Sequence, residues 1–112
     1  MSTGLIANLE KLVGTARDGA LLRYSLGSEY LKAGDRARAI AHLREALARD
    51  ADYSAAWKLL GKALSEEGSP EEALQAFERG IAAAEAKGDR QAAKEMKVFA
   101  QRLRGHKAAP TG

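Results

Sequence analysis

The sequence predicts an all-α protein in which about six helices pack as a right-handed α-α superhelix. Three observations favour this fold class. Helix-forming Ala, Leu, Glu, Lys and Arg are abundant in the 112 residues, whereas aromatic residues make up 5% and there are two prolines. Apolar residues recur with the period of a helix. Two consecutive segments also repeat each other without a gap when Ala20 is aligned with Ser54, an offset of 34 positions.

The repeat is carried by residues of matching size at corresponding positions. Identical pairs are Leu26 and Leu60, Gly27 and Gly61, Gly34 and Gly68, Ala39 and Ala73, and Ala48 and Ala82. Stacked units need such matching because each unit presents the same shape to its neighbour. We therefore expect repeat one over residues 20–53 and repeat two over residues 54–87.

Each repeat is predicted to contain two helices. In repeat two, Gly68 can end the first helix, Ser69 can cap the second, and Pro70 suits its first position. Gly34 and Asp35 take the corresponding roles in repeat one. A glycine inside a helix costs about 0.5–1 kcal/mol relative to alanine. The repeated glycines inside the first helices are therefore expected to allow close contact with the second helices.

These residues resemble the tetratricopeptide repeat family, whose 34-residue unit follows the pattern W-x2-L-G-x2-Y…A-x3-F. Repeat two matches it at Trp57, Leu60, Gly61, Ala73 and Phe77, with Leu64 at the Tyr position. Repeat one matches it at Leu26, Gly27, Tyr30, Ala39 and Ala46, with Arg23 and Leu43 at the Trp and Phe positions. The resemblance covers residues 20–87 and extends to small stand-alone bacterial proteins of this family. It implies a solenoid with two full repeats.

Flanking helices are expected to complete the core, because about three repeats are needed for stability. Residues 1–19 are predicted to form a capping helix, ending near Gly14, and a linker. Residues 88–104 are predicted to form a second capping helix, and residues 105–112 a disordered tail. The apolar stripe of the C-terminal capping helix is Ala92, Met96, Phe99 and Leu103. At the 34-residue offset, the positions of the Trp and of the Leu-Gly pair hold Gln91, Lys94 and Glu95, so this helix is not a faithful third copy.

The resemblance implies a non-catalytic interaction module or adaptor that binds a peptide in a concave groove lined by the first helix of each repeat. The groove residues are then Tyr24, Ser28, Lys32, Lys58, Lys62 and Ser65, with Leu21 as a further candidate. Lys58 and Lys62 lie one turn apart, where like charges destabilise a helix slightly. They either bind an anionic ligand such as an acidic segment or are ordinary solvated lysines. The family's carboxylate clamp for chaperone tails is absent, because Tyr24, Ser28 and Leu59 occupy its positions.

Two alternative functions remain open. Residues 87–107 carry seven lysines and arginines against two carboxylates, which would suit a polyanion or nucleic acid, although stacking aromatics are missing. Self-assembly by end-to-end stacking is the other, with the N-terminal helix as the weaker end. The expected partner is a protein or peptide, acidic in character; a monomer is expected, with a homo-oligomer left open.

Other functions are not supported by the residue types present. The chain has no cysteine, and two isolated histidines, His42 on an exposed helix face and His106 in the tail, form neither a metal site nor a catalytic pair. We therefore expect no enzyme activity and no cofactor. No apolar run approaches the roughly 20 residues of a membrane span, and the N-terminus lacks a basic region typical of a signal peptide. A soluble cytoplasmic protein is expected.

Overall fold

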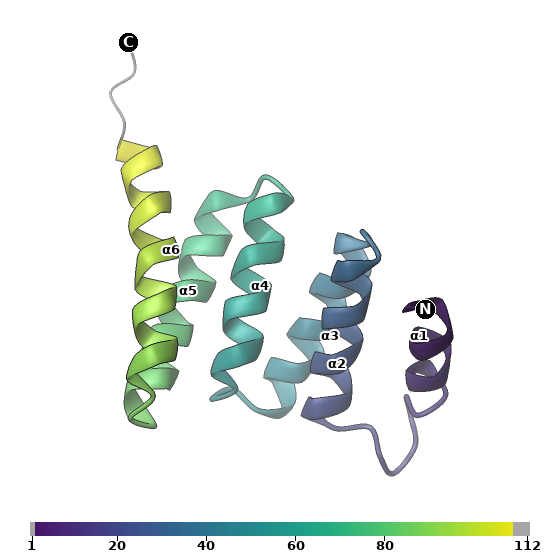
Figure 1. Ribbon diagram of the computed structural model, residues 1–112. Coiled ribbons are helices and arrows are strands. Elements are labelled where there is room, and N and C mark those ends of the chain that lie inside the picture. Colours follow the sequence, from purple (N-terminus) through teal and green to yellow (C-terminus); the bar gives the residue numbers. More distant parts are fainter. Residues whose placement is uncertain (1, 109–112) are drawn as a thin grey trace.

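The protein is described here by a computed structural model that covers residues 2–108, with side chains over residues 4–105. Its helices are α1 (Ser2–Glu10), α2 (Ala20–Lys32), α3 (Arg36–Arg49), α4 (Ser54–Glu66), α5 (Pro70–Ala86) and α6 (Arg90–Ala108). They follow one another as an up-and-down row (Figure 1). Within the described residues there is no strand, and the all-α solenoid predicted from the sequence is confirmed.

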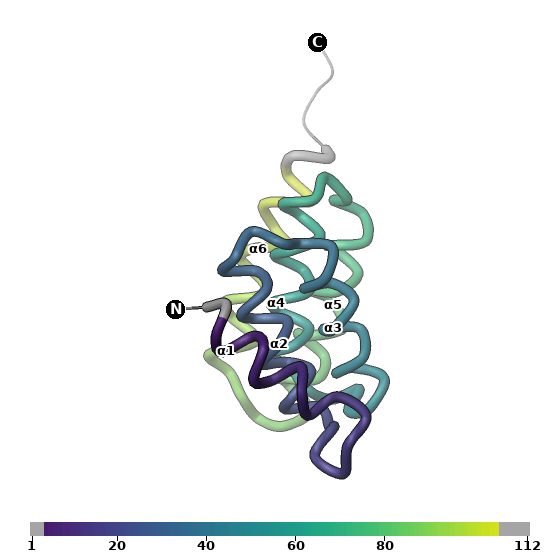
Figure 2. The backbone as a smooth tube through the Cα atoms, turned by 90° about the vertical axis from the view of Figure 1, so that its right-hand side faces the viewer, coloured from purple at the N-terminus to yellow at the C-terminus, as the bar shows by residue number. Residues whose placement is uncertain are grey.

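The helices form two layers. The first helices of the repeats, α2 and α4, lie in one layer with α6, while α3 and α5 lie in the other. Figure 2 shows the two layers side by side, viewed along the stack. Each helix packs against the next one in the chain, and α4 also contacts both α2 and α6 within its layer. The helix α1 packs mainly against α2, and its last residue, Glu10, also reaches His42 of α3.

Glycines end the first helices where the sequence predicts. Gly34 and Gly68 have φ angles of 83° and 86°, in the left-handed region that favours glycine. Asp35 then caps α3, since its Oδ1 accepts a hydrogen bond from the backbone N–H of Arg38 at 3.1 Å. Ser69 stands at the N-cap of α5, but its side chain forms no capping hydrogen bond. Pro70 favours the start of that helix instead, because its ring holds φ close to the helical value.

The core runs through both repeats into α6. Leu43, Phe77 and Met96 are completely or almost completely buried in one cluster that spans α3 to α6. A second cluster, around Leu26 and Tyr30, is covered by apolar residues of α1 and of the turn after it. Apolar burial thus reaches both ends of the row, which compensates for the small number of full repeats.

The register of α6 explains why the 34-residue offset finds no faithful third copy in this helix. Helix α5 has 17 residues, three more than α3, and the loop after it is one residue shorter. As a result α6 begins 36 positions after α4, not 34. Met96 then corresponds to Leu60, and Lys97 to Gly61. Met96 is fully buried, as Leu60 nearly is, which supports this alignment.

Two helix ends differ from the expectation. Helix α1 ends at Glu10, before Gly14, and the chain continues in tighter turns with hydrogen bonds such as Leu12 N to Leu9 O. Helix α6 extends to Ala108, so residues 105–108, which we expected in the tail, are helical. The prediction for residues 109–112 lies outside the described residues.

Candidate peptide-binding surface

The surface of the α2–α4–α6 layer that faces away from α3 and α5 is called the inner surface below. The glycines of α2 and α4 point towards the second layer, because a Cβ on Gly27 or Gly61 would meet Leu43 or Phe77. The six predicted groove residues lie outside this packed side and are half-buried or exposed. They are Tyr24, Ser28 and Lys32 on α2, and Lys58, Lys62 and Ser65 on α4.

The residues of α2 are partly engaged within the chain. The Tyr24 ring packs against Tyr53, with ring centroids 5.0 Å apart and planes tilted by 30°. The pKa of Tyr53 is raised mainly by the burial of its hydroxyl group and, to a lesser extent, by the electrostatic effect of the neighbouring Tyr24. Lys32 is exposed and pairs with Glu29 on the same helix, at 3.1 Å between Nζ and Oε2. Part of Tyr24 is therefore packing surface, and the remainder is available to a ligand.

Lys58 has an intramolecular partner. Its Nζ donates a hydrogen bond of 2.5 Å to Oε1 of Glu95, which lies on α6. This hydrogen bond is the main reason why the pKa of Glu95 is lowered; a second hydrogen bond, from Gln91, and the charge of Lys58 lower it further. Because Glu95 already balances its charge, Lys58 attracts an external anion less strongly than the sequence suggested.

Lys62 lies beside an open hollow, which we call the Phe99 pocket. The pocket has a volume of about 270 Å³ and is lined by Lys62, Ser65, Glu66, Phe77, Phe99, Arg102 and Leu103. The Phe99 ring stacks on Phe77 at 5.2 Å. Lys62 Nζ and Arg102 Cζ lie 5.8 and 5.9 Å from the Phe99 centroid, within cation–π range. Among the described residues, neither cation forms an ion pair with a carboxylate.

The part of the inner surface that α6 contributes was not predicted from the sequence. At the 36-residue offset, Val98 corresponds to Lys62, and it is exposed over 41% of its surface. Phe99, expected on the apolar stripe of this helix, is half-buried at the pocket. The pair Gly88–Asp89, which repeats the glycine-and-cap pattern of Gly34–Asp35, could have located the start of α6.

A larger groove lies on the opposite side of the molecule, between α3 and α5. Its volume is about 400 Å³, and the buried residues among those that line it are Leu47, Leu60, Leu64 and Ala76. Its polar walls pair with each other: Arg44 with Glu72 at 3.1 Å, and Arg79 with the Trp57 ring at 5.6 Å. Trp57 Nε1 also donates to the carbonyl of Ala51. Because the residues that line this groove already contact one another, we interpret the groove as part of the packing between the two repeats.

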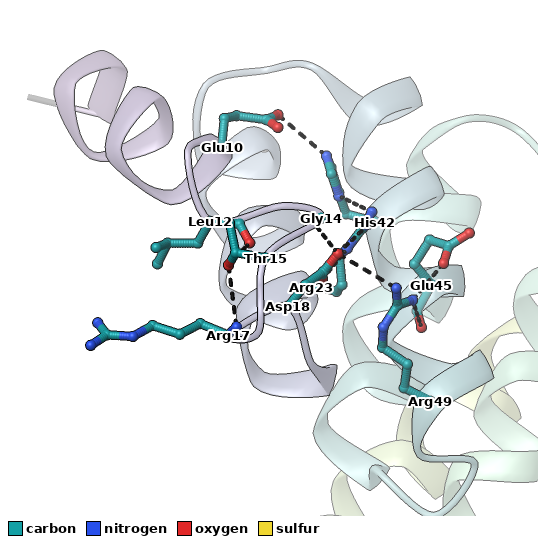
Figure 3. Close-up of polar contacts among 10 residues, drawn as sticks. All are labelled: Glu10, Leu12, Gly14, Thr15, Arg17, Asp18, Arg23, His42, Glu45 and Arg49. Carbon is teal, nitrogen blue, oxygen red and sulfur yellow. Dashed lines mark hydrogen bonds and ion pairs between the residues drawn. The ribbon is translucent and has the colours of Figure 1, made fainter.

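A polar cluster joins the N-terminal segment to α2 and α3 (Figure 3). Asp18 accepts hydrogen bonds from Arg23 Nε at 2.8 Å and from the backbone N–H of Gly14 at 2.9 Å. Arg49 of α3 lies 3.6 Å from the same carboxylate. Together these bonds lower the pKa of Asp18, with the hydrogen bond from Arg23 as the largest cause. The cluster fixes the linker that follows α1.

His42 belongs to this cluster, so the prediction that it is exposed was wrong. Its side chain is 14% exposed and stacks on Tyr30 at 5.4 Å. Its Nε2 lies 3.4 Å from Glu10, and Arg23 Nη1 lies 3.3 Å from its Nδ1. A guanidinium can only donate, so Nδ1 is the acceptor in this contact. His42 thus helps to hold α1 in place.

In the described part of the chain, no group of three or more His, Asp or Glu side chains is arranged to hold a metal ion. No helix there combines the length and the apolar character needed to cross a membrane.

Comparison with known proteins identifies the family. The model of the family described as "Tetratricopeptide repeat" matches residues 24–94, more than half of the chain. The chain is 50% identical over 99 residues to the TPR repeat-containing protein PA0015 of Pseudomonas aeruginosa, covering 88% of this chain and 94% of that protein. The chain therefore belongs to the tetratricopeptide repeat family, and the resemblance seen in the sequence is confirmed.

Solved structures agree with this assignment. Protein BPP2914 from Bordetella parapertussis is 42% identical, with a TM-score of 0.79 over 93% of this chain and 90% of its own. The Sgt2 TPR domain from Aspergillus fumigatus superimposes with a TM-score of 0.81 over 99% of this chain and 75% of its own, at 24% identity, and so shares the fold. The fold is that of protein-interaction modules, and proteins of this family are generally non-catalytic scaffolds.

Proposed function

We propose that the chain is a non-catalytic adaptor of the cytoplasm that binds an extended, acidic peptide segment of a partner protein along its inner surface. The observation that carries this proposal is the Phe99 pocket. There, Lys62 and Arg102 flank an accessible aromatic ring, and neither forms an ion pair with a carboxylate of the described residues, although Glu66 also lines the pocket. A ligand with an apolar side chain next to Asp or Glu fits both features.

The rest of the predicted groove would guide the same segment. Tyr24 offers a partly covered ring, which loses little conformational freedom on binding because Tyr53 already holds it. Ser28 and Ser65 supply hydroxyl groups that accept or donate hydrogen bonds. Lys32 and Lys58 contribute less, since Glu29 and Glu95 partly neutralise them. The binding energy is therefore expected to concentrate at the end of the inner surface where α4 meets α6.

A selection from a random peptide display library on the immobilised protein tests this proposal. We expect the enriched peptides to combine Asp or Glu with a neighbouring large apolar residue. The double variant Lys62→Glu/Arg102→Glu should lose this enrichment, because it reverses both charges at the pocket. Each enriched peptide should shift the backbone amides of α4 and α6 in NMR spectra.

The matched control is the double variant Lys11→Glu/Arg17→Glu. It causes the same change in net charge at two exposed cations near the other end of the row, and neither forms an ion pair with a carboxylate. This variant should enrich the same peptides as the parent. Equal enrichment by the pocket variant, or amide shifts confined to α3 and α5, would exclude the inner surface as the binding site.

A further inference from the structure

The side of α6 that faces away from the rest of the stack has no helix packed on it within the described residues. In the 36-residue register, α6 corresponds to the first helix of a repeat, and no second helix follows it among the described residues. We call this side the outer face of α6. Its exposed residues recur every three or four positions: Arg90, Lys94, Lys97, Gln101 and Arg104.

At its centre the outer face differs from the side of α4 that packs on α5, whereas Lys94 and Gln101 at its edge correspond to the groove residues Lys58 and Ser65. In α2 and α4 a glycine occupies the centre, and the space a Cβ would take is filled by Leu43 or Phe77 of the next helix. Lys97 occupies that position in α6. A long cationic side chain prevents the close apolar approach that joins α4 to α5. A helix that docks here must instead offer groups that pair with cations.

The charges of this face are only partly balanced. Lys97 pairs with Glu85 at 2.8 Å, and Arg104 with Glu78 at 2.7 Å, both glutamates coming from α5. Arg90 and Lys94 form no ion pair with a carboxylate among the described residues. They line a hollow of about 630 Å³ together with Ala93, Gly88 and the Glu85–Lys97 pair. The end of α6 near its first turn therefore combines free positive charge with unfilled volume.

We propose that an acidic amphipathic helix of a partner protein binds the outer face of α6, in the position that the second helix of a third repeat would occupy. The cationic row spans about 21 Å from Arg90 to Arg104 at 1.5 Å per residue. A partner helix with Glu or Asp at the same three- and four-residue spacing meets it along its whole length.

A helix suits this face better than a nucleic acid. The row is a single line of cations along one helix, and the aromatic ring of α6, Phe99, lies in the pocket of the inner surface. Single-stranded nucleic acids are usually held by exposed rings on which bases stack. The outer face provides none among its described residues, whereas paired side chains at helical spacing are what a facing helix requires.

The test uses a synthetic helical peptide of about 18 residues, long enough to cover the row at 1.5 Å per residue. Its glutamates lie on one face at the spacing of Arg90, Lys94, Lys97 and Arg104. Titration calorimetry and NMR should detect binding that shifts amides of α6 and of the C-terminal half of α5. The variant Arg90→Glu/Lys94→Glu should lower the affinity by at least about tenfold, since like charges then face each other. Lys11→Glu/Arg17→Glu and Lys62→Glu should stay within about twofold of the parent.

Four results would overturn the proposal. They are no binding of the peptide at low salt, unchanged affinity in the Arg90→Glu/Lys94→Glu variant, equal affinity for a peptide with its glutamates spread around the helix, and tighter binding of an oligonucleotide of equal charge. The last result, accompanied by a steep dependence on salt, would assign the face to polyanions instead. Because Lys62→Glu affects only the inner surface, its behaviour separates this proposal from the proposed peptide groove.

Discussion

Glycines inside helices set how closely the two layers approach. A Cβ built on Gly61 would lie 2.7 Å from Phe77 Cε1, and one on Gly27 would lie 2.6 Å from Leu43 Cγ. Real side chains do not tolerate such distances, so the helices of each pair can pack this closely only over glycine. The cost of a glycine in a helix is offset by the burial of Leu43 and Phe77, which are both essentially inaccessible to solvent.

The substitution Gly61→Ala should therefore destabilise the protein, although alanine is the better helix former. Phe77 is held between α4 and α6 and stacks on Phe99, so it has little room to move. We expect the free energy of unfolding in urea to fall by about 1–3 kcal/mol, the usual cost of overpacking a core.

Gly105→Ala is the control for this prediction. Gly105 is also helical, but a Cβ there would meet nothing within 4 Å. This variant should be as stable as the parent or more stable by a few tenths of a kcal/mol. If both variants gained stability, close approach would not be the reason for glycine at position 61.

At the scale of elements, α1 depends on polar contacts more than the other helices do. It has nine residues, and its apolar packing is against α2. Its attachment is reinforced by Glu10, which accepts a hydrogen bond of 2.5 Å from the Tyr30 hydroxyl and lies near His42. The linker after it is held by the Asp18 carboxylate, whose side chain is 8% exposed. Loss of that carboxylate should loosen the N-terminal end first.

The variant Asp18→Asn tests this attachment through pH. The pKa of Asp18 is lowered in the folded chain by Arg23 and by the backbone of Gly14, so its carboxylate stabilises the fold above the pKa of the unfolded chain, about 4. This stabilisation is lost as the pH falls through the lower folded-state value. Asp18→Asn should therefore be less stable than the parent at pH 7, and the difference should shrink below about pH 4.

Urea unfolding at pH 7 and pH 3 measures this effect. Hydrogen exchange should show that the amides of α1 lose protection in the variant before those of α5 do. Glu72→Gln removes an exposed ion pair with Arg44 and should change stability by less than about 1 kcal/mol at either pH. A stability difference for Asp18→Asn that stayed constant with pH would show that charge is not the cause.

At the scale of the whole molecule, α6 is part of one continuous core. Met96 is fully buried and stands where Leu60 stands in α4, and Phe99 extends the stack of Phe77. Two full repeats bury too little apolar surface to be stable alone, because each repeat depends on its neighbours. The protein should therefore unfold as a single cooperative unit that includes α6.

Met96→Ala tests this cooperativity. We expect it to lower the free energy of unfolding by about 2–5 kcal/mol, as for other buried large-to-small changes. The transition followed by circular dichroism and that followed by the fluorescence of Trp57, the single tryptophan, should shift together. Val98→Ala, an exposed position on the same helix, should have little effect. An unshifted Trp57 transition in Met96→Ala would mean that α6 unfolds independently.

The sequence alone determined the helical class, the 34-residue repeat and the glycine positions where α2 and α4 end. Each of these depends on local spacing: Leu26 and Leu60, or Gly34 and Gly68, occupy equivalent places whatever their distant neighbours are. The resemblance to the family could be recognised for the same reason. Even the six groove residues predicted from it fall on exposed or half-buried positions of α2 and α4, although their role in binding stays a prediction.

Only the tertiary structure decided how α6 is oriented and, with it, which side chains meet on the inner surface. A shift of two residues turns a helix by about 200° at 3.6 residues per turn. The longer α5 thereby moves Val98 and Phe99 to the inner surface and Lys97 to the outer face. It also brings Glu95 to Lys58, from which it is 37 positions distant in the chain. Local spacing does not encode such a pairing, because it depends on how three helices pack against one another.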